Sequence, residues 1–352
     1  MQVQIIIVGL GISGTWLSYF LSKKNISFLV IDEGKQNASS RVAAGIINPV
    51  TGRRVARTWL IEELMPFAWD MYNQIGNEVG GTVISKKKII EFFSAPDVKI
   101  AFDKKMAKGE PFLSPYNHPW PEDTFQTDFG CGMIDPAYVV HLETLLPAWK
   151  NKLKAGGRLL EEYFDTSLLA VSEKEIVYKD VKAEKIIFCD GVGSARSPFF
   201  SNLPFAINKG EALWLEIKNL PDNFIYKKGL SLVPACEKDV FWLGASYQWD
   251  FDNDQPDEAF RKEAEYKVKK WLKLPFRIVD HKAALRPSTV ERRPLVGFHP
   301  LYKNVGLLNG MGTKGCSLAP YFAKQLTDHI AEGLPLLPES SVGRFQKILS
   351  QH

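Results

Sequence analysis

Residues 3–34 read VQIIIVGLGISGTWLSYFLSKKNISFLVIDEG, and this stretch decides the fold. It opens with four β-branched residues, 5–8, a run that is typical of a parallel strand buried on both faces. A GxGxxG turn occupies residues 9–14, and the apolar side chains after it recur at helical spacing. A second apolar run, residues 28–31, ends at Asp32. This order of strand, glycine turn, helix, strand and acid predicts a dinucleotide-binding unit.

Each part of this stretch has a physical role in binding a dinucleotide. Gly9 permits the tight turn, Gly11 lets the backbone approach a pyrophosphate, and Gly14 lets the helix pack close to the strand. The helix would face the phosphates with its free N–H groups and the positive end of its dipole. Asp32 would accept hydrogen bonds from a ribose hydroxyl. The alternative is a glycine turn in an ordinary α/β core, and the motif alone does not distinguish FAD from NAD.

Length and composition predict a soluble globular protein of one large or two medium domains. The chain has 352 residues, of which 45% are hydrophobic and 24% charged, and a net charge of +4. Its Lys and Arg clusters are short and scattered, which favours a solvated surface over a nucleic-acid track without excluding an RNA substrate. The four cysteines form no CxxC or His pairing, so we expect reduced thiols and no metal site.

We also expect a cytoplasmic protein without a membrane span. The apolar N-terminus lacks the basic region of a signal peptide, and the nucleotide-binding unit uses all of it. No other apolar run reaches the length that crosses a bilayer.

The segment behind the first unit has the composition that a long diphosphate cofactor needs. Residues 35–49 supply hydroxyls, an Arg and small residues, although an N-cap followed by a turn is the alternative. Residues 51–76 predict a helix with an apolar stripe that faces the core. Residues 81–133 change to short β-like runs and Pro-rich loops, which indicates a second, β-rich domain.

The chain then returns to the nucleotide-binding domain and leaves it a second time. Asp135 is a predicted N-cap, with Pro136 as the first residue of a helix that extends to residue 154. Residues 185–189 predict a buried strand that ends in a second glycine turn, at 190–193. The segment 209–250 is β-rich once more.

A third glycine turn lies near the far end of the chain. Residues 304–309 predict a strand, residues 310–315 read GMGTKG, and a helix follows over 316–332. We therefore predict an α/β fold in which a Rossmann-type FAD-binding domain is interleaved with a β-rich α+β substrate domain. The predicted FAD-binding domain comprises residues 1–62, 137–205 and 284–352, and the predicted substrate domain comprises residues 63–136 and 206–283.

Six motifs together resemble the D-amino-acid oxidase and glycine oxidase family of FAD enzymes. The resemblance covers nearly the whole chain. Within the family, the sequence is most similar to the flavin domain of the bifunctional tRNA wobble-uridine enzyme, which removes a carboxymethyl group. The motifs are GLGISG, SSRVAAGII, GMIDPAYV, IIFCDGVGS, LRPSTVERRPLVG and NGMGTKGCSLAP.

The resemblance implies non-covalent FAD as the cofactor, since residues 285–289 contain no Cys for the covalent link of the sarcosine-oxidase relatives. It implies that Arg286 binds the substrate carboxylate, and that Lys314 stabilises the reduced ring or contacts the substrate. Tyr247 and Trp242 would form a substrate wall, with core packing as the alternative. The implied cofactor contacts are Gly9, Gly11, Ile12, Ser13, Gly14, Asp32, Glu33, Ser40, Arg41, Ala44, Gly45, Ile46, Gly191, Gly312, Thr313, Lys314 and Gly315.

The resulting hypothesis is an FAD-dependent oxidase or dehydrogenase that oxidises the C–N bond of an amino acid or N-substituted glycine. Hydride would pass to the flavin, the imine would hydrolyse, and oxygen or another acceptor would reoxidise the cofactor. The first alternative is removal of the carboxymethyl group from a tRNA wobble uridine, which we do not favour because the chain has no room for the partner methyltransferase domain. Two further alternatives are a flavoprotein without turnover and an NAD-dependent dehydrogenase.

Overall fold

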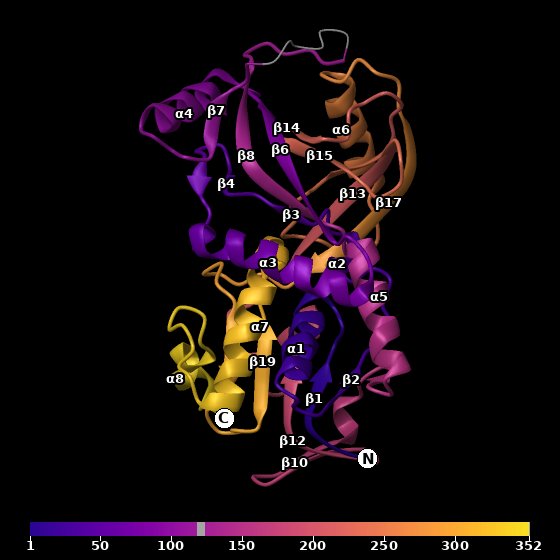
Figure 1. Cartoon of the computed structure of the whole chain (residues 1–352), viewed down its shortest axis with the longest axis vertical. Helices are drawn as coiled ribbons and strands as arrows, with labels where there is room; N and C mark the ends of the chain where they lie inside the picture. Colours follow the sequence, from indigo (N-terminus) through magenta and orange to yellow (C-terminus); the bar gives the residue numbers. More distant parts are fainter. Residues whose placement is uncertain (118–123, 352) are drawn as a thin grey trace.

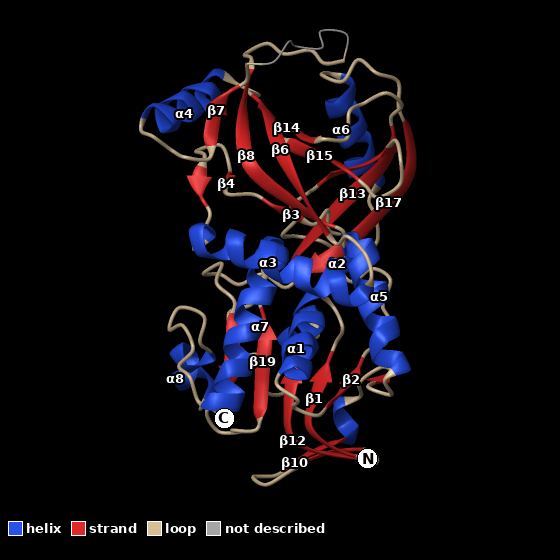
Figure 2. Cartoon of the chain, viewed as in Figure 1, coloured by secondary structure: helices blue, strands red, loops and turns tan. Residues whose placement is uncertain are grey.

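Two large β-sheets lie end to end along the long axis of the molecule (Figures 1 and 2). The computed structural model describes residues 1–117 and 124–351. Residues 118–123, in the predicted substrate domain, and residue 352, in the predicted FAD-binding domain, lie outside the described residues. The predicted α/β fold class is confirmed, and the domain boundaries stay a prediction.

The first sheet is built around the strand that opens the chain. β1 (Gln2–Val8) pairs in parallel with β2 (Phe28–Ile31) and with β12 (Val181–Phe188), and β12 pairs in parallel with β19 (Val305–Asn309). The carboxyl ends of these strands therefore meet at one edge, where the three glycine turns lie. Shorter strands complete the sheet: β9 (Leu159–Leu160), β10 (Leu169–Val171), β11 (Ile176–Tyr178) and β18 (Leu295–Phe298).

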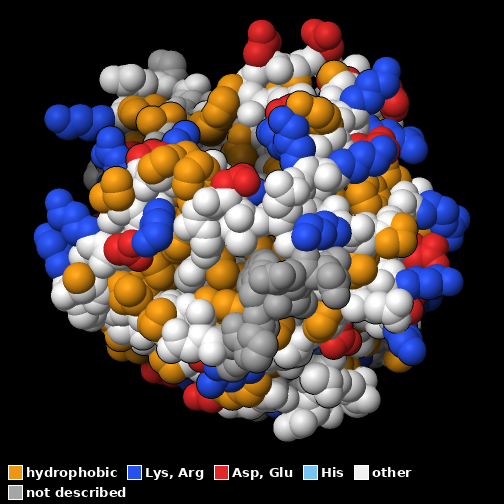
Figure 3. Space-filling view, turned by 90° about the horizontal axis from the view of Figure 1, so that it is seen from above, with side chains coloured by type: hydrophobic (Ala, Val, Ile, Leu, Met, Phe, Trp, Pro, Cys, Tyr) orange, Lys and Arg blue, Asp and Glu red, His pale blue; other side chains and the backbone are white. Residues whose placement is uncertain are grey.

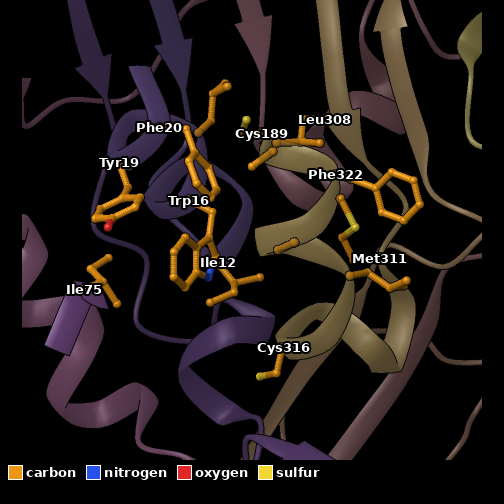
Figure 4. Packing of buried hydrophobic residues seen from close by; sticks show 14 of the residues in the cluster. Ile12, Trp16, Tyr19, Phe20, Ile75, Cys189, Leu308, Met311, Cys316 and Phe322 are labelled. Carbon is orange, nitrogen blue, oxygen red and sulfur yellow. The ribbon is translucent and has the colours of Figure 1, made fainter. Parts of the chain in front are cut away.

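Three helices pack against this sheet, α1 (Ile12–Lys23), α5 (Leu142–Ala155) and α7 (Gly315–Glu332), and α3 (Ile61–Val79) packs against α5 and α7. α1 carries no charged residue before Lys23, and this composition suits a helix that is buried on nearly all sides. Its Trp16 ring meets the ring of Tyr72 in α3 edge to face at 4.9 Å. Figure 4 shows Trp16 and Phe20 of α1 on the side that faces α7, which carries Phe322. The helices thus hold the start of α1 at a fixed place above the strand ends.

The second sheet forms the upper half of Figure 1. Apolar side chains on one face pack under α6 (Glu258–Lys269), and those on the other face form a separate cluster that includes α4 (Pro96–Ala107). The strand order is β17 (Arg277–Arg286), β13 (Asn208–Glu216), β16 (Val240–Gly244), β15 (Leu230–Pro234), β14 (Phe224–Lys228), β6 (Ile84–Phe92), β8 (Cys131–Val140) and β3 (Ile46–Ile47), with β7 (Leu113–Pro115) paired to β8.

Short elements connect the two sheets and end the chain. They are α2 (Ser39–Val42), β4 (Val50–Thr51), β5 (Ala56–Arg57), the 3₁₀ helices η1 (Thr166–Leu168), η2 (Gly191–Arg196), η3 (Gly312–Lys314) and η4 (Val342–Phe345), and α8 (Gln346–Leu349).

The predicted helix over residues 51–76 is wrong at its start. β4 and β5 form a small hairpin there, and α3 begins only at Ile61. Gly52 and Val55 both have positive φ angles, of 74° and 48°, so the backbone turns back on itself before a helix can form. The later part is confirmed, because Leu64, Ala68 and Tyr72 are buried in the core under the first sheet.

The predicted helix over residues 137–154 is also wrong at its start. Asp135 and Pro136 lie inside strand β8, and the helix α5 begins at Leu142. β8 pairs with β6, and at its end also with β3, and Asp135 forms an ion pair with Lys88 of β6 at 3.0 Å. Pairing with two neighbouring strands outweighs the local N-cap signal.

The remaining global predictions concern membranes, metals and thiols. Every helix within residues 1–117 and 124–351 is too short or too polar to cross a bilayer. The same residues contain no group of His, Cys, Asp or Glu side chains that could hold a metal ion. None of the four cysteines forms a disulfide within the chain.

Two glycines give a matched test of how closely the residue before β3 approaches the end of β8. Gly45 and Gly52 have nearly equal φ angles of 75° and 74°, but a Cβ on Gly45 would lie 2.0 Å from the carbonyl oxygen of Val140, whereas Gly52 faces open space. Gly52→Ala should lower the free energy of unfolding by roughly 1 kcal/mol through backbone strain alone. Gly45→Ala should lower the free energy of unfolding several times more, because β8 must also move to make room for the Cβ. Denaturant titration of both variants checks this, and equal losses would contradict the close approach.

Candidate functional site

A cavity of about 600 Å³ lies where the carboxyl ends of the first sheet's strands face the second sheet. Its volume is in the range of roughly 300–1,000 Å³ that is typical of ligand sites. The wall comes from segments far apart in the chain, 8–13, 31–46, 188–197, 284–287 and 309–316, together with strands of the second sheet. The three glycine turns of the sequence therefore meet around one space.

The first glycine turn is packed too tightly for any other residue. A Cβ on Gly14 would lie 2.0 Å from the carbonyl oxygen of Gly9, and a Cβ on Gly9 would lie 2.7 Å from that of Cys189. α1 can therefore begin directly above the ends of β1 and β12. Asp32 accepts backbone hydrogen bonds from Leu10 at 2.7 Å and Gly34 at 2.8 Å, which fixes its carboxylate at the cavity wall.

The charges around this end of the cavity suit a dinucleotide. Arg41 and Arg196 lie on the wall, and neither forms an ion pair with an acid in the described part of the chain. With the N-terminus of α1 they provide positive charge where a diphosphate would lie. The residues present therefore fit the group that the sequence predicts: a glycine cradle, cations and an acid at the end of β2.

The second part of the wall contains Arg286, the last residue of β17. Its Nη1 donates to Oδ1 of Asn208 at 2.9 Å and to the carbonyl oxygen of Ser246 at 3.0 Å. Its guanidinium lies 4.7 Å from the ring centroid of Tyr247. Burial lowers the pKa of Arg286, and no carboxylate of the described residues forms an ion pair with it. The guanidinium is thus a half-buried cation at a cavity, with N–H groups left for a ligand.

One glycine makes this position possible. A Cβ on Gly210 of β13 would lie 1.8 Å from Nη2 of Arg286, so the guanidinium occupies the space that any other side chain would fill. Nothing in the local sequence around Gly210 marks it as functional.

The structure brings together nearly all residues that the sequence selects. Gly14 is buried behind the turn and does not line the cavity. Lys314 also lies outside the wall, with a pKa lowered by burial and by the charges of Arg293 and Arg292. The residues that do line it are Gly9, Gly11, Ile12, Ser13, Asp32, Glu33, Ser40, Arg41, Ala44, Gly45, Ile46, Gly191, Tyr247, Arg286, Gly312, Thr313 and Gly315.

Trp242, which the sequence offers as a substrate wall with core packing as the alternative, lines the cavity and donates from Nε1 to the carbonyl oxygen of Val42 at 2.8 Å, which ties the second sheet to α2. Asn37 and Asp254 also line the cavity, and neither is among the predicted site residues. Asn37 donates to Asp254 at 2.8 Å across 217 residues of chain, and Lys35 lies 3.5 Å from the same carboxylate. No sequence signal reveals such pairs, because neither partner belongs to a motif.

The geometry defines a nucleotide-cofactor protein with a cation at the far end of the cofactor cavity. Residues 4–329 match the family described as FAD dependent oxidoreductase, DAO. The match covers most of the chain, so the protein belongs to this family, and it is an FAD-dependent oxidoreductase.

Solved structures share the whole fold at low sequence identity. Glycine oxidase from Geobacillus kaustophilus superposes with a TM-score of 0.78 at 17% identity, over 95% of this chain and 96% of that one. Iminodiacetate oxidase from Chelativorans sp. BNC1 superposes with a TM-score of 0.76 at 15% identity, over 96% of this chain and 98% of that one. L-proline dehydrogenase from P. horikoshii superposes with a TM-score of 0.76 at 15% identity, over 98% of each chain. At these identities the likeness establishes the fold.

A buried acid at the cavity gives a pH-dependent test. Asp190 accepts a hydrogen bond from Ser194, and burial raises the pKa of its carboxyl from 3.8 to about 6. The folded state therefore retains this proton while the unfolded chain loses it, so stability from this group is present below pH 4 and is lost as the pH rises to about 6. We expect the Asp190→Asn apoprotein to gain on the order of 3 kcal/mol relative to the unmodified protein between pH 4 and pH 7.

Thermal or denaturant unfolding of both apoproteins across this pH range provides the measurement. Asp222→Asn is the matched control, because Asp222 is exposed and the same substitution there should leave the pH profile unchanged. A pH-independent difference between Asp190→Asn and the unmodified protein would contradict the raised pKa.

Proposed function

We propose that the protein oxidises the C–N bond of an amino acid or N-substituted glycine whose carboxylate binds Arg286. The observation that carries this proposal is the half-buried guanidinium of Arg286 on the wall of the cofactor cavity, which pairs with no carboxylate of the described residues. A carboxylate is the ligand that matches its planar fork, since two parallel hydrogen bonds and opposite charge then act together.

The surroundings of Arg286 leave part of its fork free. Nη1 already donates to Asn208 and Ser246, which fixes the plane of the guanidinium, and Nη2 and Nε have no acceptor among the described residues. Tyr247 covers one face of the guanidinium, although its side chain is 59% exposed to solvent. These contacts orient a carboxylate and reduce its access to water on the Tyr247 side.

FAD, when bound, supplies the acceptor for the hydride that leaves the substrate carbon. The residues that would hold it are Asp32 and Glu33 at the ribose, the turn 9–14 with Ser40 and Arg41 at the diphosphate, and 44–46 with 312–315 near the ring. The start of α7 would add positive potential beside the ring. The chain's own residues thus anchor the cofactor and orient the substrate.

The proposal includes a non-covalent cofactor. Two cysteines line the cavity, Cys189 and Cys316, and both are buried. Burial raises the pKa of Cys189 well above its usual range and that of Cys316 to about 12, so neither thiol readily becomes the thiolate that a covalent link requires.

Substrate class is supported by what the similar structures are named for. Glycine, iminodiacetate and L-proline are each an amine beside a carboxylate, and the proteins named for them share this fold. The tRNA alternative is not favoured by the surface that Figure 3 shows, where Lys and Arg side chains stand apart, separated by acidic and apolar ones. The electron acceptor, oxygen or another, belongs to the same proposal.

The overall reaction has a direct spectroscopic test. Anaerobic addition of glycine, N-methylglycine, iminodiacetate, L-proline or D-amino acids to the yellow holoprotein should bleach the flavin absorbance with at least one compound. Air should then restore the colour if oxygen is the acceptor. Flavin released on denaturation should be free FAD. No bleaching with any carboxylated amine would contradict the proposal.

Arg286 has a test that separates substrate binding from cofactor binding. Arg286→Ala should lower kcat/KM for the best substrate about 100-fold or more, mostly through KM, because a charged two-point contact is lost, while FAD content stays unchanged. Gly210→Ala should show the same loss with Arg286 intact, since a Cβ there displaces the guanidinium. Gly229→Ala is the control, because Gly229 faces open space. Unchanged kinetics in Arg286→Ala would remove this residue from the site.

A further inference from the structure

Three cations, Arg292, Arg293 and Lys314, lie on neighbouring segments beside the flavin cavity, and none of them pairs with an acid in the described part of the chain. We propose that they form an anion-binding subsite at the rim of the cavity. It takes a second acidic group, a carboxylate or a phosphate, of a substrate whose first carboxylate binds Arg286. This inference rests on the proposed function and narrows its substrate class to compounds with two acidic groups.

The position of the cluster follows from how two segments pack. The amide of Gly312 donates to the carbonyl oxygen of Pro287 at 3.2 Å, and both residues line the cavity. A Cβ on Gly310 would lie 2.8 Å from Cγ2 of Thr289. The segment that follows Arg286 and the turn that ends in Lys314 therefore lie against each other, directly outside the wall.

The turn that carries the two arginines is held in one conformation. Thr289 is buried, its Oγ1 donates to the carbonyl oxygen of Arg293 at 2.7 Å, and the Arg293 amide donates back to it at 3.1 Å. The Arg292 amide donates to the carbonyl oxygen of Thr289 at 3.0 Å, and Arg292 has a φ angle of 54°, which is unfavourable for a residue with a side chain. Such a conformation costs on the order of 1 kcal/mol and persists only where the surroundings impose it.

The side chains of the cluster are placed by aromatic packing and by a helix start. The guanidinium of Arg293 lies 4.2 Å from the ring centroid of Trp59, which stacks on Phe322 of α7 at 5.9 Å. Lys314 is the N-cap residue of α7, an 18-residue helix whose dipole is also positive at this end. A lysine is therefore held where the local potential is already unfavourable for it.

Counter-charges are missing from the cluster. In residues 1–117 and 124–351, no Asp or Glu pairs with Arg292, Arg293 or Lys314. Glu291, their neighbour in sequence, pairs with Arg344 at 3.1 Å instead. Burial lowers the pKa of Lys314, and the nearby charges of Arg293 and Arg292 lower it further. A solvated surface patch is the simpler interpretation. A binding site is favoured because hydrogen bonds fix the turn at Thr289, the guanidinium of Arg293 stacks on Trp59, and Lys314 is half-buried.

An anion would satisfy all three groups at once. Carboxylate and phosphate oxygens accept charge-assisted hydrogen bonds from guanidinium and ammonium groups, and the helix N-terminus adds to the attraction. Thr313 and Gly315, on either side of Lys314 in the chain, line the same cavity as Arg286, so an elongated molecule bound at Arg286 can extend along this wall toward the cluster.

The test compares how carboxylates perturb the flavin absorbance of the holoprotein. A series from malonate to pimelate is titrated beside monocarboxylates of equal chain length, and 3-phosphonopropionate is compared with succinate to distinguish phosphate-type from carboxylate groups. At least one dianion should bind about tenfold more tightly than its monoanionic match. Arg292→Asn combined with Arg293→Gln should remove this advantage and change monocarboxylate affinity less than twofold. Asn suits position 292 because it tolerates positive φ.

Further variants separate the possible outcomes. Lys314→Met should weaken the dianion and Lys314→Arg should restore it, which controls for a folding defect at the start of α7. Lys104→Gln with Lys262→Gln removes two exposed charges from α4 and α6, in the upper half of Figure 1, and should leave the tighter binding of the dianion intact.

An equal affinity for mono- and dianions at every chain length, or tighter dianion binding that survives the arginine substitutions, would overturn the subsite. If no carboxylate perturbs the flavin, the proposed function fails and the subsite fails with it.

Discussion

The structure depends on how closely the start of α1 approaches the ends of β1 and β12. The absence of side chains at Gly9 and Gly14 allows this contact, since a Cβ at either position would overlap a carbonyl oxygen. Two consequences follow from it. The N-terminus of α1 is held over the strand ends, where its dipole acts on the cavity, and the helix buries Trp16 against Tyr72 of α3. One contact thus positions both the diphosphate end of the site and the core that supports it.

Much of the first sheet and of the cavity wall could be predicted from the sequence, because both are built from continuous motifs. Residues 3–34 specify a strand, a turn and an acid within a short stretch, and the same logic located the turns at 190–193 and 310–315. Arg286 could be selected from the sequence because it lies in a motif. Its contacts with Gly210 and Asn208 could not be predicted, because these two residues belong to a different strand and carry no local signal.

The two helices that were predicted to begin too early share one cause, which is that strand pairing outweighs local helix signals. Asp135 followed by Pro136 is a good helix start in isolation, but β8 exchanges hydrogen bonds with β6 along most of its length and with β3 at its end. Lys314 illustrates a different limit. Its place in the glycine turn predicts a cofactor contact, and in the structure it does not line the cavity that its neighbours Thr313 and Gly315 line. The position of a residue in the sequence predicts which turn contains it, but it does not predict the direction of its side chain.

The path of the chain after Arg286 has a mechanical consequence. β17 ends at Arg286 in the second sheet, and β18 begins at Leu295 in the first, so the chain crosses between the sheets at the wall of the cavity. The hydrogen bonds of Thr289 stiffen this crossing segment. The position of Arg286 is therefore tied to the angle between the sheets.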